Sequence, residues 1–254
     1  MDWAPGYREL EPSQPGLMPA VTCLWARVAG PRGDPVTLVL PDGCVDLIWA
    51  QGHGVFVAGP DTGPAPAVMA PGSVFAGVRF APGAGGPALG MPLSALLNQR
   101  VDAAHLGCGP AAALARLPED VAPDVALRML VDAAGAMVAE RPADRLVTEA
   151  ARLLGHSGSR VDAVAGRLGV SERQLRRRCQ AAVGYGPATL RRVLRFRRFV
   201  SWIDAGAGGK DGTDDGELAV VAADLGYADQ AHLTRESVRL AGLPPTALVA
   251  ARRP

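Results

Sequence analysis

The amino-acid sequence predicts an α+β chain, in which a small antiparallel β-sandwich or barrel with following helices precedes an all-α domain. Short apolar runs separated by turn residues between residues 20 and 80 indicate strands. Helical periodicity begins near residue 92. A helix-turn-helix pattern then occurs twice after residue 144, with a linker helix between the copies. Because Pro142 disfavours a helical Arg141, we expect domains at 1–141 and 142–254.

The composition is that of a globular protein with an uneven charge distribution. Of the 254 residues, 48% are hydrophobic and 20% are charged, which argues against a disordered chain. Residues 1–143 hold 8 Lys and Arg against 13 Asp and Glu, whereas residues 144–254 hold 18 against 12. This asymmetry is expected if only the C-terminal half binds a polyanion, and a chance imbalance of surface charge is the alternative.

The sequence shows no segment that directs a protein to a membrane or out of the cell. No apolar run reaches about 18 residues, and the first residues lack the basic-then-apolar pattern of a signal peptide. The four cysteines, Cys23, Cys44, Cys108 and Cys179, form no CxxC pair, which predicts neither a zinc ribbon nor a disulfide framework. We therefore expect a cytoplasmic location, where thiols stay reduced.

The N-terminal domain is predicted to be rich in strands over 20–80 and helical over 92–140. Six apolar runs lie between PDG, QGHG and APG turns, at 20–30, 36–40, 44–50, 54–59, 67–70 and 73–80. Six strands suffice for a small sandwich or barrel. Residues 1–20 are rich in Pro and Gly and are interpreted as an irregular lead-in.

The duplicated unit of the second domain begins with a short amphipathic helix. Apolar residues recur at i, i+3, i+4 and i+7 in both copies, each 57 positions from its counterpart: Val161, Val164, Ala165 and Leu168, then Leu218, Val221, Ala222 and Leu225. Each stripe gives a two-turn helix one buried face. Gly169 and Gly226 supply the left-handed residue that a tight turn after a helix needs. Ser159 and Asp162 are a predicted capping box for the first copy, and Asp214 or Asp215 a predicted cap for the second.

The second helix of each unit follows with an offset of 58. The matching pairs are Leu175 and Leu233 in the core, Arg177 and Arg235 two residues later, the closing Gly184 and Gly242, and Pro187 and Pro245 beyond them. The turn of the second copy therefore holds one extra residue. Agreement at about nine positions with one consistent slip indicates a structural repeat rather than chance.

The exposed side chains of these second helices are the candidate DNA contacts, because the second helix of a helix-turn-helix enters the major groove. They are Arg173, Arg176, Arg177 and Gln180 in the first unit and Gln230, His232, Thr234, Arg235 and Arg239 in the second. Arginine pairs with guanine through two hydrogen bonds, and glutamine pairs with adenine in the same way. In the linker helix over 187–203, Arg191 and Arg192 are candidate phosphate contacts. The alternative is that RQLRRR is only a solvated face.

These motifs resemble those of the AraC/XylS transcriptional regulators. The resemblance covers about 145–251 and rests on AxxxGVSxxxLxR, on GYxDxxxLxR and on the GxxP closing of each unit. It implies a seven-helix DNA-binding domain with base-contacting positions at Arg173, Arg176 and Arg177 and at Gln230, Ala231, His232 and Arg235. The family usually has Phe where this chain has Cys179 and Ser237, and the loop at 205–216 is longer than usual. We therefore expect the first motif to carry most of the affinity for DNA.

The N-terminal half resembles a domain found in a subgroup of these regulators, whose function is generally not assigned. The resemblance spans about 10–120 and rests on LPDGCVDLIW and on GVRFAPGAGG with the residues that follow it. Members of the family often carry a cupin-like sensor barrel in this place, which implies a small-molecule effector. The candidate ligand-binding residues are Trp25, Asp42, Cys44, Asp46, Trp49, Phe56, Arg79 and Phe80.

Strand alternation sorts the residues of CVDLIW between two faces. Cys44, Asp46 and Ile48 lie on one face, and Val45, Leu47 and Trp49 on the other. Asp46 could bind a polar ligand group or pair with Arg79; the simpler interpretation has Leu47 and Trp49 in the core and Asp42 and Asp46 at a turn and an edge. Cys44 is either a thiol sensor or, more commonly for cysteine, a small buried hydrophobe. A metal site at Cys44, Asp46 and His53 matches no known ligand spacing.

Together these features predict a sequence-specific transcriptional regulator that responds to a small molecule and uses no cofactor or metal. The expected partners are double-stranded DNA, an effector, RNA polymerase if the protein activates transcription, and a second copy if 121–140 forms a dimer interface. The alternatives are a DNA-associated enzyme, an alkylation- or redox-sensing protein that uses an N-terminal cysteine, and a protein–protein adaptor. The four histidines and the lack of an HxH pair or a Ser/His/Asp set argue against an enzyme.

Overall fold

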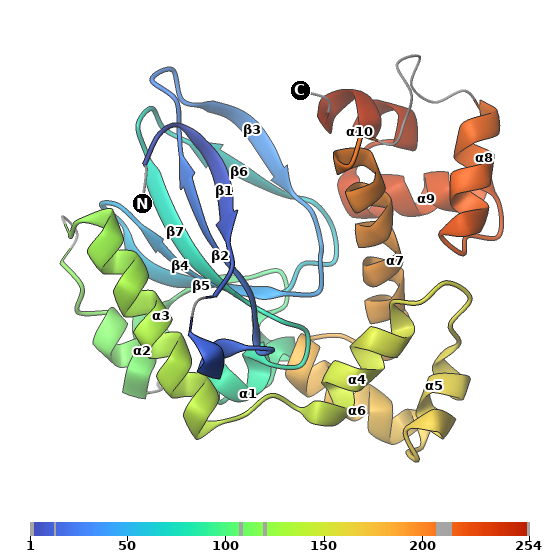
Figure 1. Cartoon of the computed structure of the whole chain (residues 1–254), viewed down its shortest axis with the longest axis horizontal. Coiled ribbons are helices and arrows are strands. Elements are labelled where there is room, and N and C mark those ends of the chain that lie inside the picture. The colour runs from blue at the N-terminus through green and yellow to red at the C-terminus, as the bar shows by residue number, and fades with distance from the viewer. Residues whose placement is uncertain (1–2, 13, 107–108, 119–120, 207–214, 253–254) are drawn as a thin grey trace.

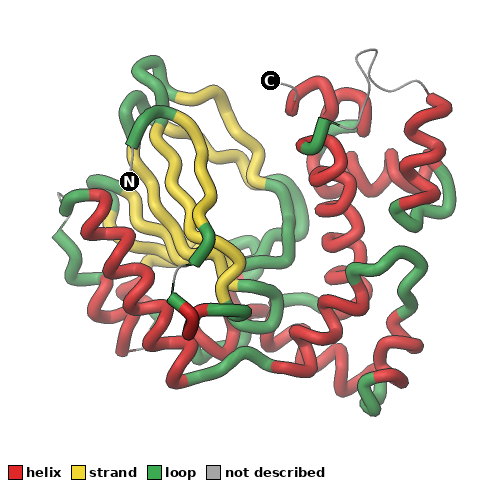
Figure 2. The backbone as a smooth tube through the Cα atoms, in the orientation of Figure 1, coloured by secondary structure: helices red, strands yellow, loops and turns green. Residues whose placement is uncertain are grey.

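The computed structural model describes residues 3–12, 14–106, 109–118, 121–206 and 215–252. A β-rich domain with its own helices is followed by an all-helical domain, so the predicted α+β class is confirmed (Figures 1 and 2). One apolar core lies within 17–137 and a second within 147–249, and the boundary predicted at 141/142 falls between them. No helix of the described segments is long and apolar enough to cross a membrane.

The strands of the described residues form two separate antiparallel ladders. One sheet has the order β1 (Gly6–Leu10), β2 (Val21–Val28), β7 (Val74–Phe80), β4 (Val45–Ala50), β5 (Gly54–Ala58) and β8 (Arg100–Asp102). β3 (Asp34–Val39) and β6 (Ala65–Met69) pair only with each other. This two-stranded ribbon lies on the side of the sheet that faces the helical domain (Figure 1). Because the two ladders share no strand, the architecture is an open sheet with a ribbon over one face and not a closed barrel.

Each of the six predicted strands is present, but two edge strands were missed. β1 lies inside the segment interpreted as an irregular lead-in, and β8 lies inside the segment predicted to be helical, between the 3-10 turns Leu93–Leu96 and Ala103–His105. Both strands pair on one side only, β1 with β2 and β8 with β5. Both strands are mostly exposed, so their sequences lack the alternation of apolar and polar residues by which a strand is recognised.

Helices cover the face of the sheet opposite the ribbon. They are α1 (Gly85–Leu89), α2 (Gly109–Leu114) and α3 (Pro123–Glu140). α3 packs along β7 and β4 (Figure 1). Leu47, Trp49, Val78 and Phe80 point to this side and are fully buried. At about 25 cal/mol per Å² of buried apolar surface, this layer is the main source of stability for the domain.

Within its described residues, the C-terminal domain has seven helices, as the resemblance implied. They are α4 (Arg145–Leu154), α5 (Val161–Arg167), α6 (Glu172–Val183), α7 (Pro187–Asp204), α8 (Asp215–Asp224), α9 (Gln230–Ala241) and α10 (Pro245–Arg252). Helices α5 and α6 form one helix-turn-helix and α8 and α9 the other, with α7 between them (Figure 1). Gly169 and Gly226, with φ of 66° and 80°, make the left-handed turns that the spacing predicted.

The predicted N-caps of α5 and α8 differ in their outcome. Ser159 does not cap α5, because its Oγ donates to Leu154 O at 2.9 Å and the N-cap is Arg160 without a side-chain bond. Residues 207–214 of the glycine- and aspartate-rich loop, with the predicted cap Asp214, lie outside the described residues.

The positions that lack the usual Phe are fully buried small residues. Cys179 sits in the C-terminal core, and Ser237 donates its hydroxyl to Leu243 O at 2.7 Å. The aromatic residues of this core include Phe196 and Phe199 of α7, which are fully buried and adjacent, and the buried Tyr185 and Tyr227. The hydrogen bond to Leu243 O offsets the cost of burying the Ser237 hydroxyl.

Candidate DNA-binding surface and ligand cavity

Helix α6 presents arginines on the side opposite its buried stripe. A capping box fixes its start, with Gln174 N donating to Ser171 Oγ at 3.2 Å and Ser171 N donating to the Gln174 side chain at 2.9 Å. Arg173, Arg176 and Arg177 are exposed, whereas Leu175 is fully buried. Gln180 is half-buried. The helix thus offers three guanidiniums to a groove.

The fourth arginine of this run has a structural partner. Arg178 donates to the Asp144 carboxylate through Nε at 2.8 Å and Nη2 at 2.6 Å. Asp144 also caps α4, because it accepts from Leu146 N and Val147 N. The bidentate ion pair fixes α6 against the start of α4, and Arg178 is therefore separated in role from its three exposed neighbours.

Helix α9 presents a smaller polar face. Asp229 caps the helix by accepting from His232 N at 2.6 Å. Arg235 is exposed, with 69% of its side chain accessible. Gln230 and Thr234 are half-buried, and the Thr234 hydroxyl donates to Gln230 O at 3.0 Å. Arg239, also predicted on this face, is exposed, so α9 offers two exposed arginines where α6 offers three, and its face is less basic.

A buried carboxylate ties the linker helix to α9. Glu236, 7% exposed, accepts from Arg192 Nε at 3.0 Å and from Arg195 Nη2 at 2.7 Å. His232 Nε2 lies 3.5 Å from the same carboxylate. Arg195 also donates to Gly226 O at 3.0 Å and stacks over Tyr227 at 4.4 Å from the ring centre. This group of five side chains, which we call the Glu236 cluster (Arg192, Arg195, Tyr227, His232, Glu236), holds the second helix-turn-helix on α7.

The Glu236 cluster and one further hydrogen bond change how three predicted DNA contacts are interpreted. Arg192 and His232 face Glu236, and Arg191 Nη1 donates to Ser159 O at 2.7 Å. Their donors already have acceptors inside the protein, so fewer remain for phosphate or base. The periodicity of a helix predicts which positions lie off its apolar face. It does not predict an ion pair with a carboxylate on another helix.

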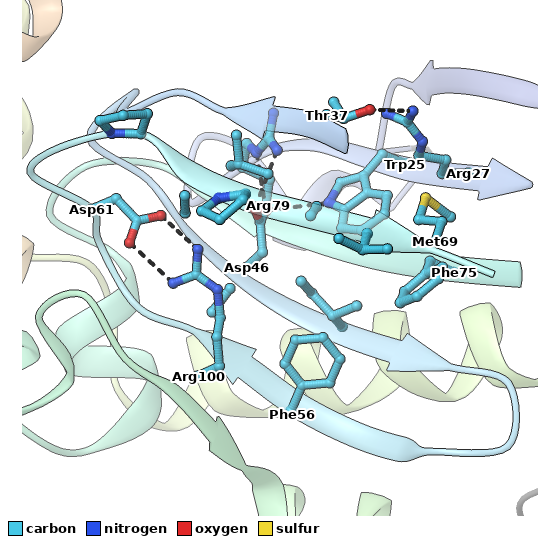
Figure 3. Close-up of a pocket in the computed structure, with 18 of the residues that line it drawn as sticks. Trp25, Arg27, Thr37, Asp46, Phe56, Asp61, Met69, Phe75, Arg79 and Arg100 are labelled. Carbon is cyan, nitrogen blue, oxygen red and sulfur yellow. Dashed lines mark hydrogen bonds and ion pairs between the residues drawn. The ribbon is translucent and has the colours of Figure 1, made fainter. Parts of the chain in front are cut away.

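A cavity of about 680 Å³ lies between the sheet and the β3–β6 ribbon (Figure 3). Its floor is apolar and partly aromatic, with Trp25, Ile48, Phe56 and Phe75 from the sheet. The ribbon contributes Met69 and other apolar groups to the opposite wall. Arginines lie at the edges, from β2, β7 and β8 (Figure 3). The size and the lining match those of small-molecule sites.

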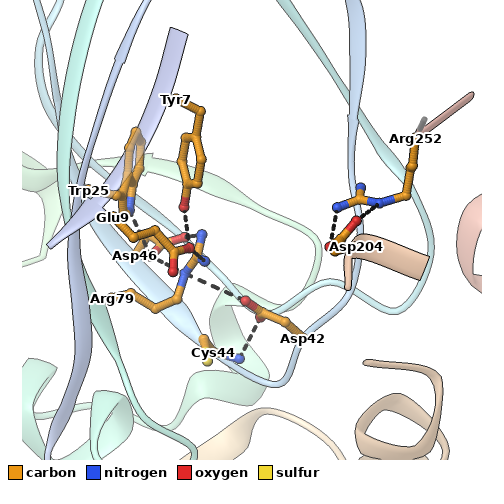
Figure 4. A network of polar contacts seen from close by, with 9 residues as sticks. All are labelled: Tyr7, Glu9, Trp25, Asp42, Cys44, Asp46, Arg79, Asp204 and Arg252. Atoms are coloured by element: carbon orange, nitrogen blue, oxygen red, sulfur yellow. Dashed lines mark hydrogen bonds and ion pairs between the residues drawn. The ribbon is translucent and has the colours of Figure 1, made fainter. Parts of the chain in front are cut away.

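The polar wall of the cavity is built on Arg79 (Figure 4). Arg79 donates to Asp46 through Nε at 3.0 Å and Nη2 at 3.2 Å, and Asp46 also accepts from Trp25 Nε1 at 3.2 Å. Asp42 and Glu9 lie 3.5 Å from the same guanidinium. Burial works against the Arg79 charge, but Asp46 and Asp42 together raise the pKa of the guanidinium above its usual value.

The structure brings half of the predicted ligand-binding residues to this cavity. Trp25, Asp46, Phe56 and Arg79 line it, and the predicted pairing of Asp46 with Arg79 is observed. Trp49 and Phe80 lie instead in the core under α3, as strand alternation requires. Asp42 joins the network from the edge and accepts from Cys44 N at 2.8 Å. The missed lining residues include Tyr7 and Arg100, which belong to the two unpredicted edge strands.

The cysteines of the described segments are buried thiols. Burial raises the pKa of Cys23 to about 11 and that of Cys179 to about 12. Burial, with the nearby Asp42 charge, raises the pKa of Cys44 well above its usual value. A protonated, inaccessible thiol reacts slowly, which favours the buried-hydrophobe interpretation of Cys44. Cys108 lies outside the described residues, and within them no group of three His, Cys, Asp or Glu side chains could hold a metal ion.

Comparison with known proteins agrees with the two halves seen in the structure. Residues 8–102 match a domain family of unknown function, DUF6597, and residues 164–251 match a helix-turn-helix domain family. No curated protein matches the chain.

Similar solved structures are those of ToxT from Vibrio cholerae. One covers 89% of this chain and 97% of its own, with 9% identity and a TM-score of 0.46. A second, described as bound to an unsaturated fatty acid, covers 91% and 96%, with 11% identity and a TM-score of 0.44. Values this low support no inference about ligand or partner.

The helix-turn-helix match covers α6 to α10 and the end of α5, which are the elements that present the exposed arginines. It places the chain among transcription factors and not among enzymes. The chain is a DNA-binding transcriptional regulator that carries an AraC-type helix-turn-helix domain after a DUF6597 domain.

Proposed function

We propose that this regulator reads a specific DNA sequence with α6 and α9 and responds to a small molecule held in the cavity of its N-terminal domain, residues 1–141. The observation that carries the proposal is the pairing of two features in one chain: a helix with three exposed arginines and a cavity of about 680 Å³ with an apolar floor. DNA is the partner for the helix with the exposed arginines, and an effector is the partner for the cavity. A cytoplasmic protein fits both roles.

The α6 arginines are the proposed base and phosphate contacts of the first motif. Arg173, Arg176 and Arg177 lie within about one and a half turns of the helix start, where recognition helices meet base edges. A good bidentate pair with guanine contributes about 1–3 kcal/mol of discrimination. Arg235 and Gln230 are the proposed contacts of the second motif. With fewer cations on its face, α9 adds less affinity than α6.

The cavity suits a compact and mostly apolar ligand with a few hydrogen-bonding groups. Its floor of Trp25, Ile48, Phe56 and Phe75 favours flat or branched hydrocarbon surface. The arginines at its edges are not bare charges, because Arg79 pairs with Asp46 and Arg100 with Asp61. A ligand therefore binds by filling apolar volume and by exchanging hydrogen bonds at these pairs.

Two further proposals concern partners. RNA polymerase is the expected partner if the protein activates transcription. The second proposed partner is another copy of this chain, bound through α3. The buried stripe of α3 faces the sheet, and Met129 on its outer side is 38% exposed. The oligomeric state of the full chain in solution, measured by sedimentation, tests the second of these.

Selection of bound sequences from random duplex DNA tests the DNA-reading part of the proposal. The full chain should enrich one sequence, and Arg177→Ala should lose preference at one base position. Arg152→Ala is the matched control, because it removes one exposed positive charge from α4, where Arg152 pairs with Glu149 and lies close to His156. Equal loss of affinity on all sequences for Arg177→Ala would contradict its role in base readout.

A further inference from the structure

One short segment of the N-terminal domain contacts the closing turn of both recognition helices. This segment, residues 59–64, joins β5 to the β3–β6 ribbon and is called the bridge segment below. A methyl group added to Gly184, which ends α6, would lie 2.6 Å from Pro60 Cγ. A methyl group added to Gly242, which ends α9, would lie 3.6 Å from Pro64 Cγ. The two prolines are four residues apart, and each packs on a different helix-turn-helix unit.

The two prolines can come this close because Gly184 and Gly242, which end the helices, have no side chain. Both Gly184 and Gly242 have positive φ, at 93° and 71°, as the C-cap of a helix in the Schellman or αL form requires. A methyl group added to Gly63 would lie 3.7 Å from Arg239 O in the last turn of α9. The bridge segment therefore touches the backbone of the recognition helices and not flexible side-chain ends.

The other side of the bridge segment is a wall of the cavity. Asp61, Thr62, Gly63 and Pro64 all line it (Figure 3 shows Asp61). The bridge segment thus lies between the cavity on one side and the ends of the two recognition helices on the other.

The bridge segment is held in place from β8 and the turn before it. Asp61 accepts from Arg100 through Nη2 at 2.7 Å and Nη1 at 3.0 Å, and Arg100 itself lines the cavity (Figure 3). Thr62 N donates to Asn98 Oδ1 at 2.8 Å, and Asn98 N donates to Pro60 O at 3.0 Å. Asn98 adopts φ of 57°, a left-handed conformation that asparagine tolerates better than most residues. The anchor is therefore polar and lies where a ligand would compete for it.

We propose that the bridge segment transmits occupancy of the cavity to DNA binding by setting the relative placement of α6 and α9. This inference rests on the proposed function and names its route of regulation. A ligand that shifts the Asp61–Arg100 pair moves Pro60 and Pro64 together, and with them the ends of both recognition helices. The two motifs are joined otherwise by α7, so each can bind a half-site, but their joint binding to one duplex depends on their spacing.

Joint binding is where the effect must appear. When two linked modules engage one duplex, the second contact is intramolecular and its strength depends on how well the linkage matches the span. Loosening the bridge segment should leave each motif intact and lower the gain from using both. The ratio of affinity for a two-half-site duplex to that for a duplex with only the α6 half-site measures this gain, because any change in the α6 motif cancels in it and the variants below leave the residues of α9 unchanged.

The test compares the full-length chain with variants of the anchor on two duplexes. The duplexes are the sequence selected by the wild-type chain and the same sequence with the α9 half-site scrambled. Asp61→Asn and Arg100→Gln should each lower the affinity ratio about tenfold, as expected when an effective concentration is lost. Glu149→Gln, which breaks an exposed ion pair with Arg152 on α4, should leave the ratio within twofold of wild type.

Two more variants guard against unfolding and test the cavity directly. Pro64→Ala removes the ring at Gly242 without touching the ion pair, and should lower the ratio in the same direction. Ala67→Phe adds bulk to the cavity from the ribbon, and should change the ratio at least threefold without loss of the helical signal in circular dichroism.

The outcomes separate the inference from the function on which it rests. A wild-type chain that binds neither duplex in a salt-dependent way contradicts the proposed function and the inference together. A wild-type chain that binds the two-half-site duplex, with ratios unmoved by Asp61→Asn, Pro64→Ala and Ala67→Phe, contradicts the inference alone.

Discussion

The Glu236 cluster makes a quantitative prediction about the second helix-turn-helix. Glu236 is 7% exposed and is the shared acceptor for Arg192 and Arg195, which come from the linker helix. Replacing it with alanine leaves two guanidiniums without their carboxylate. Breaking a buried ion pair by removing one partner costs about 3–5 kcal/mol. Because 30% of the Arg192 side chain is exposed and can regain water, we expect the lower end of this range for Glu236→Ala.

The loss should leave the chain folded and weaken the attachment of α9. A loss of about 3 kcal/mol is a large share of the 5–15 kcal/mol by which domains of this size are stable, but does not exceed it. Arg195 would keep its bond to Gly226 O and its stacking on Tyr227. Glu236→Gln should cost less, because the amide oxygen can still accept one hydrogen bond from Arg195.

Urea unfolding followed by circular dichroism at 222 nm measures this loss, with Glu149→Ala as the matched control. Glu149 pairs with Arg152 on the exposed side of α4, where water screens both charges and the pair contributes little to stability. A double-mutant cycle with Arg195→Ala isolates the coupling between the two side chains. If Glu236→Ala lowers the free energy of unfolding by no more than the control does, the cluster does not hold the second motif and the argument is wrong.

Three further predictions concern the interface, the DNA face and the thiols. Gly86→Val should destabilise the chain, because even the Cβ atom there would lie 2.5 Å from Ala181 O on α6. The melting temperature should therefore fall below that of the wild type. An unchanged melting temperature would show that α1 can move away from α6 at no cost. Arg177→Ala should change base preference at one position with little change in the slope of log affinity against log salt; a slope reduced by about one with base preference unchanged would indicate a phosphate contact and contradict the assignment to base readout. Cys23 and Cys44 should resist a thiol reagent at pH 8 in the folded chain and react on unfolding. Because burial raises the pKa of Cys23 to about 11 from its usual 9, the free energy of unfolding should fall as pH rises from 9 through 11. Rapid labelling of both at pH 8 without unfolding would contradict the burial.

The helical domain was largely predictable because its information is local. The spacing of Val164, Ala165 and Leu168 with Gly169 fixes a short amphipathic helix and the turn after it, and the same signals recur 57 residues later. Glycine at a position of positive φ leaves a clear mark in a sequence. Periodicity also separated buried Leu175 from exposed Arg177 correctly.

The site was only partly predictable because its contacts join distant segments. Arg192 looks exposed on a helical stripe, yet its carboxylate partner lies 44 residues further along. The wall of the cavity depends on β1 and β8, which carry weak strand signals, and on a ribbon whose strands are separated by β4 and β5 in sequence. Pairing of Asp46 with Arg79 could be foreseen from alternation and charge, but which face holds the cavity depends on where α3 packs.

Selection from random duplex DNA with the full-length chain, followed by affinity measurements over a range of salt, tests the central claim most directly. We predict one enriched sequence with two blocks separated by about one helical turn, 10–10.5 base pairs, and an affinity that falls steeply with salt. The block read by α6 should be the stronger of the two. Failure to enrich any sequence, together with binding that does not depend on salt, would contradict the assignment of this chain as a regulator that reads DNA through two helix-turn-helix motifs.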